Sequence, residues 1–143
     1  MHKIVKQLTF CYGHRLLEYQ GKCARPHGHT ALVEIELASS QLNALGMVRD
    51  FGEVKDILGR YIEDTFDHRM ILRQDDPLVK ALRDLGEEVV VLPVNPTAEH
   101  LARILFEQAR KLDLPVSAVR LWETQDSYAE YGLQGCELEQ EKE

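Results

Sequence analysis

The chain has 143 residues, 44% of them hydrophobic and 29% charged, and 17 Lys plus Arg against 24 Asp plus Glu give a formal net charge of -7. This length and composition predict one soluble globular domain over residues 1–143, with a frayed tail at about 137–143. The acidic charge argues against a protein that coats nucleic acid or anionic membrane. No apolar run approaches the ~20 residues that cross a bilayer.

The N-terminus and the cysteines indicate the cellular compartment. Residues 1–10 lack the apolar core of a signal peptide. Cys11, Cys23 and Cys136 are odd in number and widely spaced, which favours neither a disulfide framework nor a zinc ribbon. We therefore expect a cytoplasmic protein, and the roles of Cys11 and Cys136 stay open.

Positive charge is concentrated near the N-terminus. Residues 1–33 contain five Lys or Arg side chains and the single acid Glu18, a net +4, so the remaining residues carry -11. A locally positive segment on an acidic protein could attract a small anionic ligand. Uneven sampling of charge is the alternative, and the sequence does not decide between the two.

Apolar residues that alternate with polar ones predict two strands in the first third of the chain. The first covers residues 2–10. The second is clearer, with apolar side chains on one face at Ala31, Val33, Ile35 and Leu37. A turn-rich insertion at 12–28 separates the two, so we expect it at one end of a hairpin.

The rest of the chain alternates between helical and extended patterns. Helical spacing predicts helices at 51–65, 77–86 and 95–112, the first ending near residues 66–72. A short β-branched strand is expected at 88–94, and two final strands at 116–124 and 127–133. This order predicts an α+β fold, with an antiparallel sheet of four long strands covered by helices on one face. The open edges of such a sheet favour pairing with another subunit, so we expect an oligomer.

Two closely spaced histidines stand at the start of the second predicted strand. Alternate residues of an extended chain point to the same side, so His27 and His29 can reach one cation. His14 follows the first strand, and a hairpin would bring it beside them. Three imidazoles with the fourth position open are the ligand composition of a catalytic zinc site, so we predict that these residues bind Zn²⁺.

Cys23 has three interpretations. It could be a fourth metal ligand, because it lies four residues before His27, or a small buried apolar residue, or a base or nucleophile. We prefer the last interpretation. A dication, Lys22 and Arg25 would all favour the thiolate, and the surrounding residues are typical of an exposed loop.

Several acidic positions also have two interpretations. Asp67 and His68 stand where a helix should end, where a histidine favourably meets the negative helix terminus, and adjacent residues do not ordinarily face each other. Glu99 lies in the first turn of a helix, where an acid is favourable. Glu123, beside Trp122 at the end of an apolar strand, is more distinctive. Its carboxylate could accept two N–H bonds from a pterin or guanine ring edge.

Six short motifs follow one another along the chain: G-H at 13–14, C-x3-H-G-H at 23–29, G-M-V-x-D-F at 46–51, D-H at 67–68, N-P-T-A-E at 95–99 and W-E-T at 122–124. In this order, and over residues 4 to 131, they resemble the 6-pyruvoyltetrahydropterin synthase / 6-carboxytetrahydropterin synthase family. The resemblance implies a tunnelling fold (T-fold), whose subunits join their sheets into a barrel. It also implies a homo-oligomer built from trimers, a hexamer or similar, with active sites at subunit interfaces.

The resemblance further implies 7,8-dihydroneopterin triphosphate as the substrate. The roles it implies are metal ligation by His14, His27 and His29, proton transfer by Cys23, Asp67 and His68, and pterin binding by Glu123, Thr97 and Glu99. From charge alone, Lys22 and Arg25 are candidates to bind the triphosphate.

The sequence of the loop at 22–30 is closer to bacterial carboxy-type enzymes of 7-deazapurine (queuosine) biosynthesis than to animal pyruvoyl-type enzymes. The reaction implied is therefore formation of 6-carboxy-5,6,7,8-tetrahydropterin with release of acetaldehyde and triphosphate. The pyruvoyl product, formed by triphosphate elimination, is the alternative, followed by a non-catalytic pterin- or purine-binding zinc module. Ala31, where the family often has an aromatic residue, and the segment 69–73 depart from the family pattern and leave the exact product open.

Overall fold

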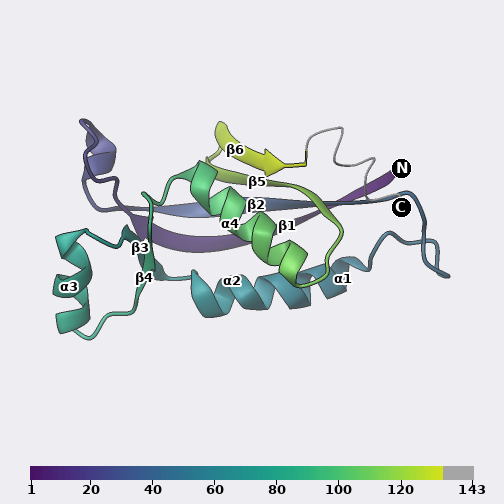
Figure 1. The fold of residues 1–143 in the computed structure, drawn as a ribbon, viewed down its shortest axis with the longest axis horizontal. Helices are drawn as coiled ribbons and strands as arrows, with labels where there is room; N and C mark the ends of the chain where they lie inside the picture. The colour runs from purple at the N-terminus through teal and green to yellow at the C-terminus, as the bar shows by residue number, and fades with distance from the viewer. Residues whose placement is uncertain (134–143) are drawn as a thin grey trace.

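The computed structural model describes residues 1–133 and contains a six-stranded mixed sheet. The strands are β1 (His2–His14), β2 (His27–Ser39), β3 (Arg69–Arg73), β4 (Val89–Leu92), β5 (Val116–Thr124) and β6 (Ser127–Gly132), in the order β4-β3-β1-β2-β5-β6 (Figure 1). The predicted sheet of four antiparallel strands was wrong in number and direction. Strands β1, β2, β5 and β6 are antiparallel as expected, but β3 and β4 add a parallel extension beside β1. The predicted frayed tail and Cys136 lie outside the described residues.

Strand β3 was not predicted, because its sequence lies where the first helix was expected to end. His68, with φ 61°, turns the chain out of the helix, and β3 then pairs with β1 in parallel, from Tyr12 opposite Arg69 to His14 opposite Ile71. Met70 packs so closely on Gly13 that a side chain at residue 13 would collide with its sulfur atom. A larger residue at position 13 would therefore require the flexible Met70 side chain of β3 to move.

The β1–β2 hairpin is longer than the sequence pattern indicated. The two strands pair without a break from His2 opposite Ser39 to His14 opposite His27, so only residues 15–26 form the connection between them. A 3₁₀ turn, η1 (Lys22–Ala24), lies within this connection. The consequence for function is that His14 and His27 are direct neighbours across the hairpin.

The helices begin at the capping residues that the sequence supplies. The first helical stretch runs through α1 (Phe51–Val54), a π-helical turn η2 (Lys55–Gly59) and α2 (Arg60–Thr65). Helix α3 (Pro77–Asp84) is capped by Asp76, and α4 (Ala98–Lys111) by Thr97. The α1–α2 stretch and α4 cover one face of the sheet (Figure 1). None of the helices in residues 1–133 is long and apolar enough to span a membrane.

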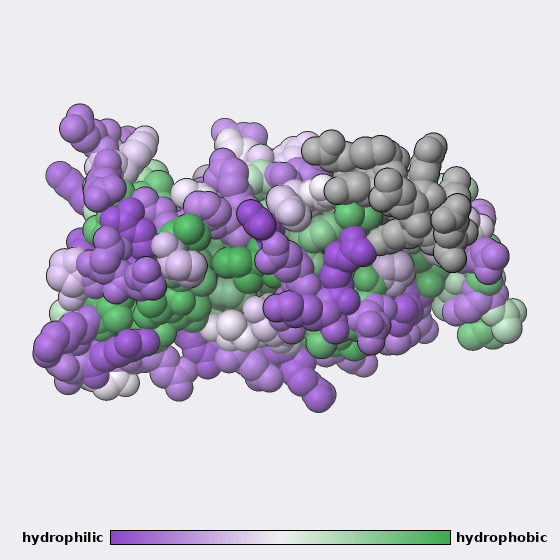
Figure 2. Space-filling model, in the orientation of Figure 1, coloured by the Kyte–Doolittle hydropathy of each residue, from purple (hydrophilic) through white to green (hydrophobic). Residues whose placement is uncertain are grey.

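The core lies between the sheet and these helices. Val33, Ile35 and Leu37 of β2 are fully buried on the helix-covered face, together with Phe10 and Tyr12 of β1. On the outside, the face in Figure 2 is mostly hydrophilic, and hydrophobic residues reach the surface between α3 and α4. Because strand residues alternate between faces, the period that buries these side chains also directs three histidines to the helix-covered side.

Candidate metal centre and active site

Three imidazole rings converge at the end of the β1–β2 hairpin. The ring centroids of His14, His27 and His29 lie 4.5 to 5.1 Å apart, and one nitrogen from each ring falls within 4.8 Å of the other two. His14 Nε2 and His27 Nε2 are 3.0 Å apart. Two nitrogens bound to one tetrahedral zinc at about 2.0–2.1 Å would be roughly 3.3 Å apart, close to this separation. This cluster could therefore hold a metal ion.

Backbone carbonyls orient two of the three rings. His14 Nδ1 donates to the carbonyl oxygen of Pro96 and His27 Nδ1 to that of Arg25, both at 2.7 Å. These bonds place the proton on Nδ1 and leave the Nε2 lone pairs facing each other, an arrangement that a cation stabilises. His29 Nε2 is buried and has no hydrogen-bond partner in the described structure. One nitrogen of each of the three rings is thus available to ligate a metal ion.

The electrostatics of His14 favour the neutral form that a metal requires. Its side chain is 3% exposed, and this burial lowers the pKa of His14 below its ordinary value, although the hydrogen bond to Pro96 opposes the shift. A neutral imidazole is the form that ligates metal ions.

Glu123, near the end of β5, lies against the same cluster. Its Oε1 is 4.0 Å from His14 Nε2, and its Oε2 is 3.9 Å from His29 Nε2. The hydroxyl of Tyr12 donates a hydrogen bond to Oε1 at 3.1 Å. Sequence reasoning missed Tyr12. The available signal was its position two residues before His14 on the same strand, which places both side chains on one face.

A cavity of about 220 Å³ adjoins the cluster and brings several predicted residues together. Its wall includes His14, Cys23, Thr97, Glu99 and Glu123. Cys23 is half-buried on η1. Thr97 also caps α4 by accepting a hydrogen bond from the backbone N–H of residue 100, so it combines the structural role that the sequence indicated with a place in this cavity. A thiol, a hydroxyl and two carboxylates thus surround a space large enough for part of a small polar molecule.

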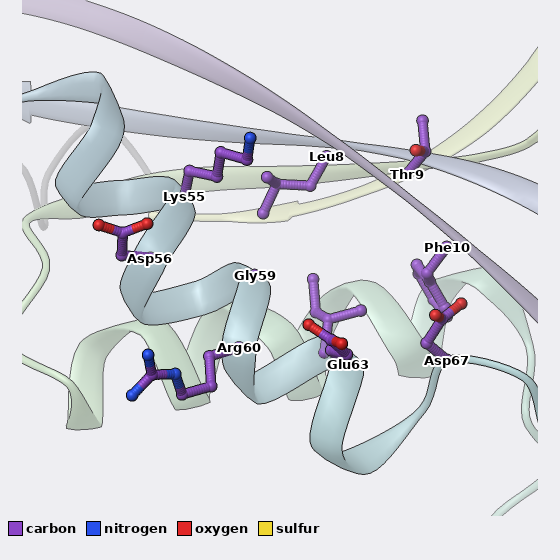
Figure 3. Close-up of a pocket in the computed structure, with 10 residues that line it drawn as sticks. Leu8, Thr9, Phe10, Lys55, Asp56, Gly59, Arg60, Glu63 and Asp67 are labelled. Carbon is purple, nitrogen blue, oxygen red and sulfur yellow. The ribbon is translucent and has the colours of Figure 1, made fainter.

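Asp67 and His68 do not line the cavity that contains Cys23. His68 is instead 77% exposed and lies with His27 and His29 along a separate groove of about 590 Å³. Asp67 also borders a hollow of about 330 Å³ between β1 and the α1–α2 stretch (Figure 3). Within one chain, the structure therefore leaves these two residues apart from Cys23.

Asp67 and His68 do face each other, contrary to the expectation for adjacent residues. The positive φ of His68 brings its Nδ1 to 3.0 Å from Asp67 Oδ2, while Asp67 Oδ1 accepts from the backbone N–H of Cys11 at 2.9 Å. Burial raises the pKa of the Asp67 carboxyl. The hydrogen bonds from Cys11 and His68 outweigh burial and leave the pKa below its ordinary value. The pair is thus an ionised carboxylate that orients an exposed imidazole.

Lys22 and Arg25 are exposed residues on and beside η1. Neither lines the cavity of Cys23, although the carbonyl of Arg25 holds His27. Both cations therefore lie in the connection formed by residues 15–26, and their side chains are not part of the cavity wall.

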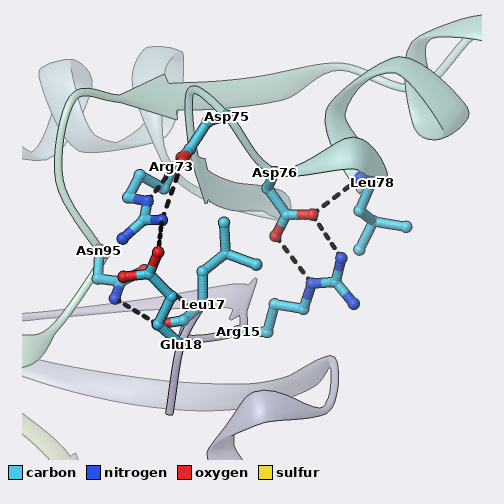
Figure 4. A network of polar contacts seen from close by, with 8 residues as sticks. All are labelled: Arg15, Leu17, Glu18, Arg73, Asp75, Asp76, Leu78 and Asn95. Atoms are coloured by element: carbon cyan, nitrogen blue, oxygen red, sulfur yellow. Dashed lines mark hydrogen bonds and ion pairs between the residues drawn. The ribbon is translucent and has the colours of Figure 1, made fainter.

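A network of polar contacts, which the sequence did not reveal, fixes the connection that carries Cys23 (Figure 4). The Asn95 side chain accepts from the N–H of Leu17 and donates to its carbonyl, each at 3.0 Å. Arg15 donates twice to the buried carboxylate of Asp76, at 2.8 and 2.5 Å. The backbone N–H of Leu16 donates to the carbonyl of Cys23 at 2.9 Å. Hydrogen bonds thus attach the connection at residues 15–26 to the segment between β4 and α4 and to the N-terminus of α3.

Comparisons with known proteins agree with this geometry. A family model described as 6-pyruvoyl tetrahydropterin synthase matches residues 3–134. A Rickettsia conorii protein named 6-carboxy-5,6,7,8-tetrahydropterin synthase is 36% identical over 137 residues, covering 91% of this chain and 99% of its own. A Haemophilus influenzae protein of the same name is 33% identical over 139 residues, covering 92% and 99%.

Solved structures share the fold. An uncharacterized protein from Wolinella succinogenes superposes with a TM-score of 0.76 at 28% identity, covering 93% of this chain and 98% of its own. The 6-pyruvoyl tetrahydropterin synthase of Caenorhabditis elegans superposes with a TM-score of 0.68 at 21% identity, covering 93% and 96%. The family match and the curated relatives show that the chain belongs to the 6-pyruvoyl tetrahydropterin synthase family.

Proposed function

We propose that this protein is a zinc-dependent 6-carboxy-5,6,7,8-tetrahydropterin synthase that acts in 7-deazapurine (queuosine) biosynthesis. It would convert 7,8-dihydroneopterin triphosphate and one water into 6-carboxy-5,6,7,8-tetrahydropterin, acetaldehyde and triphosphate. The pterin ring gains two hydrogens while the side-chain carbon attached to it is oxidised to a carboxylate, so no external oxidant is needed. The observation that carries the proposal is the convergence of three imidazoles at one point, where His14 also lines a cavity together with the thiol of Cys23 and the carboxylate of Glu123.

The metal in this proposal is zinc, held by His14, His27 and His29. The three-nitrogen donor set without a thiolate supports a catalytic rather than a structural ion. Bound there, zinc supplies Lewis acidity that makes C–H and O–H protons of a coordinated hydroxyl-bearing side chain easier to remove. Cys23 is then free of ligation and remains available for proton transfer.

The residues of the cavity have separate roles in the proposal. Glu123 accepts hydrogen bonds from the N–H groups of the pterin ring. Thr97 and Glu99 contact the pterin from the neighbouring wall of the cavity. Cys23 removes a proton from the substrate side chain. Lys22 and Arg25, which are exposed beside this loop, attract the triphosphate by charge.

The catalytic site of the proposal includes a second copy of the chain. Among the described residues, β1 pairs with β3 only at Tyr12 to His14, so the same edge of β1 over residues 3–10 has no strand partner. Strands β4 and β6 are the edge strands of the sheet within the described residues, and edges of this kind are closed in barrels. We infer a trimer-based assembly in which Asp67 and His68 of one copy reach the Cys23 cavity of another.

Incubation of the zinc-loaded protein with 7,8-dihydroneopterin triphosphate, followed by an assay for acetaldehyde, tests the proposal. Acetaldehyde and 6-carboxytetrahydropterin in equal amounts are expected. Triphosphate release without acetaldehyde would instead support the pyruvoyl reaction. If zinc and neopterin bind but no turnover occurs, the protein is a binding module and the enzymatic proposal is wrong.

A further inference from the structure

We propose that Tyr12 is a positioning residue whose hydroxyl holds Glu123 as a pterin-binding carboxylate and prevents it from becoming the fourth metal ligand. The inference deepens the function proposed above and rests on it, because it takes the three histidines as the zinc site and Glu123 as the pterin anchor. It concerns the hydrogen bond of 3.1 Å from the Tyr12 hydroxyl to Glu123 Oε1.

The Tyr12 ring is held on three sides. It is 3% exposed, stacks on Phe10 with centroids 5.3 Å apart, and meets the edge of His14 at 5.1 Å. His29 contacts it from β2 at 5.7 Å. A tyrosine side chain has only two rotatable bonds, so packing of the ring also fixes the hydroxyl. The hydroxyl is therefore a preorganised donor.

Glu123 has two possible uses that exclude each other. Its two oxygens lie 4.0 Å from His14 Nε2 and 3.9 Å from His29 Nε2, close to the centre toward which the histidines point. A carboxylate that moved inward would ligate zinc at about 2.0–2.2 Å and complete a closed four-ligand site. In its present position the carboxylate is 27% exposed and faces the cavity of Cys23, where it can accept bonds from a ligand.

The chemistry of the phenol suits this function. A phenol hydroxyl is protonated at neutral pH, so it donates its proton to the Glu123 carboxylate in the hydrogen bond between them. A neutral donor holds the carboxylate without adding a positive charge beside the metal. The bond to Tyr12 uses only part of the acceptor capacity of the carboxylate, because each oxygen has two lone pairs.

The test compares Tyr12→Phe with the matched variant Tyr61→Phe. Tyr61 is a partly buried tyrosine of α2 that packs against Phe66, away from the histidines. Zinc affinity is measured on metal-free protein by competition with a chromophoric chelator. We expect Tyr12→Phe to bind zinc about tenfold more tightly and zinc-loaded Tyr12→Phe to bind neopterin about tenfold more weakly, the size expected for one hydrogen bond to a charged group. Tyr61→Phe should change neither affinity.

A second pair of variants examines the same bond from its acceptor. In a Glu123→Gln background, Tyr12→Phe should change zinc affinity by less than about twofold, because the group that would ligate the metal has been removed. Unchanged zinc and neopterin affinities in Tyr12→Phe would overturn the inference, and so would a zinc effect of the same size in the Glu123→Gln background. Failure of the wild-type protein to bind neopterin would contradict the proposed function, whereas the zinc measurements would still decide whether Tyr12 restrains Glu123.

Discussion

The carbonyl oxygen of Pro96 accepts a hydrogen bond from His14 Nδ1 at 2.7 Å and thereby directs Nε2 of the same ring toward His27. The residue before the cap of α4 thus fixes the tautomer of a side chain on β1 that lies 82 positions earlier in the sequence. A backbone acceptor is not removed by substituting its side chain. Orientation of the histidine cluster therefore depends on the β4–α4 connection as well as on the hairpin.

Replacement of His27 by Ala should abolish stoichiometric metal binding. It removes one of three ligands and leaves the remaining two with too few donors for a stable tetrahedral site, so we expect metal affinity to fall by at least about 100-fold. Metal content after dialysis, measured by mass spectrometry, checks this. His2→Ala, at the exposed start of β1, is the control and should keep its metal. Full metal content in His27→Ala would place the ion elsewhere.

Replacement of Cys23 by Ala should separate turnover from metal binding. The thiol lines the cavity beside His14 but is not one of the three converging ligands, so zinc content should be unchanged. Loss of an acid/base group should lower kcat for acetaldehyde release by roughly 100- to 10,000-fold. If zinc is lost as well, Cys23 is a fourth ligand and the assignment as a base is wrong.

The histidine cluster could be predicted from the sequence because it depends on the alternation of side chains along two strands. Alternation along β1 and β2 places His14, His27 and His29 on one face, and hairpin pairing places them at one end. The N-cap of α4 at Thr97 could also be predicted, because capping involves only residues that are close in sequence. These features follow from strand alternation, helix capping and the pairing of β1 with β2 alone.

What the sequence did not reveal depends on contacts between distant segments. Strand β3 is five residues long, shows no polar alternation and begins after a non-glycine residue with positive φ. The contacts of Tyr12 with Glu123 and of Asn95 with Leu17 join residues 111 and 78 positions apart. No periodicity encodes such pairs, which emerge only when the sheet and α4 are packed together.

Replacement of Asp76 by Asn should destabilise the protein at neutral pH. Asp76 is buried, accepts two bonds from Arg15, and caps α3 through Leu78. Asn can still cap the helix but loses the charge. We expect a decrease of about 2 kcal/mol in the free energy of unfolding, measured with urea at pH 7.

The effect of Asp76→Asn should depend on pH in one direction. The hydrogen bonds from Arg15 hold the pKa of Asp76 below its ordinary value despite its burial. A carboxyl with a lowered folded-state pKa stabilises the protein fully above its unfolded-state pKa, about 3.9, and this stabilisation disappears as the pH falls through the folded-state value. The difference between wild type and Asp76→Asn should therefore be constant from pH 7 to about 5 and shrink below about 4. A difference that grows in acid would contradict this assignment.

Substitution of Asn95 should loosen the loop that carries Cys23 in two steps. Asn95→Asp keeps an acceptor for the N–H of Leu17 but loses the donor to its carbonyl, whereas Asn95→Ala loses both bonds. We expect unfolding free energies lower by about 1 and 2 kcal/mol respectively. Amide hydrogen exchange in residues 15–23 should rise in the same order, while exchange in the centre of β5 should not. Equal exchange in all three proteins would mean that other contacts hold the loop.

Mixing two inactive variants should restore activity if the catalytic site is shared between copies. Cys23→Ala lacks the thiol, and His68→Ala lacks the exposed imidazole, which lies outside the Cys23 cavity of its own chain. After the two are unfolded and refolded together in equal amounts, random assortment gives roughly a quarter of shared sites with both residues intact. Acetaldehyde release should then recover to about that fraction of wild type, and size-exclusion chromatography with light scattering should report a trimer or a multiple of it. Each variant refolded alone is the control. A mixture as inactive as its components would place Cys23 and His68 in the same chain's site or outside the chemistry.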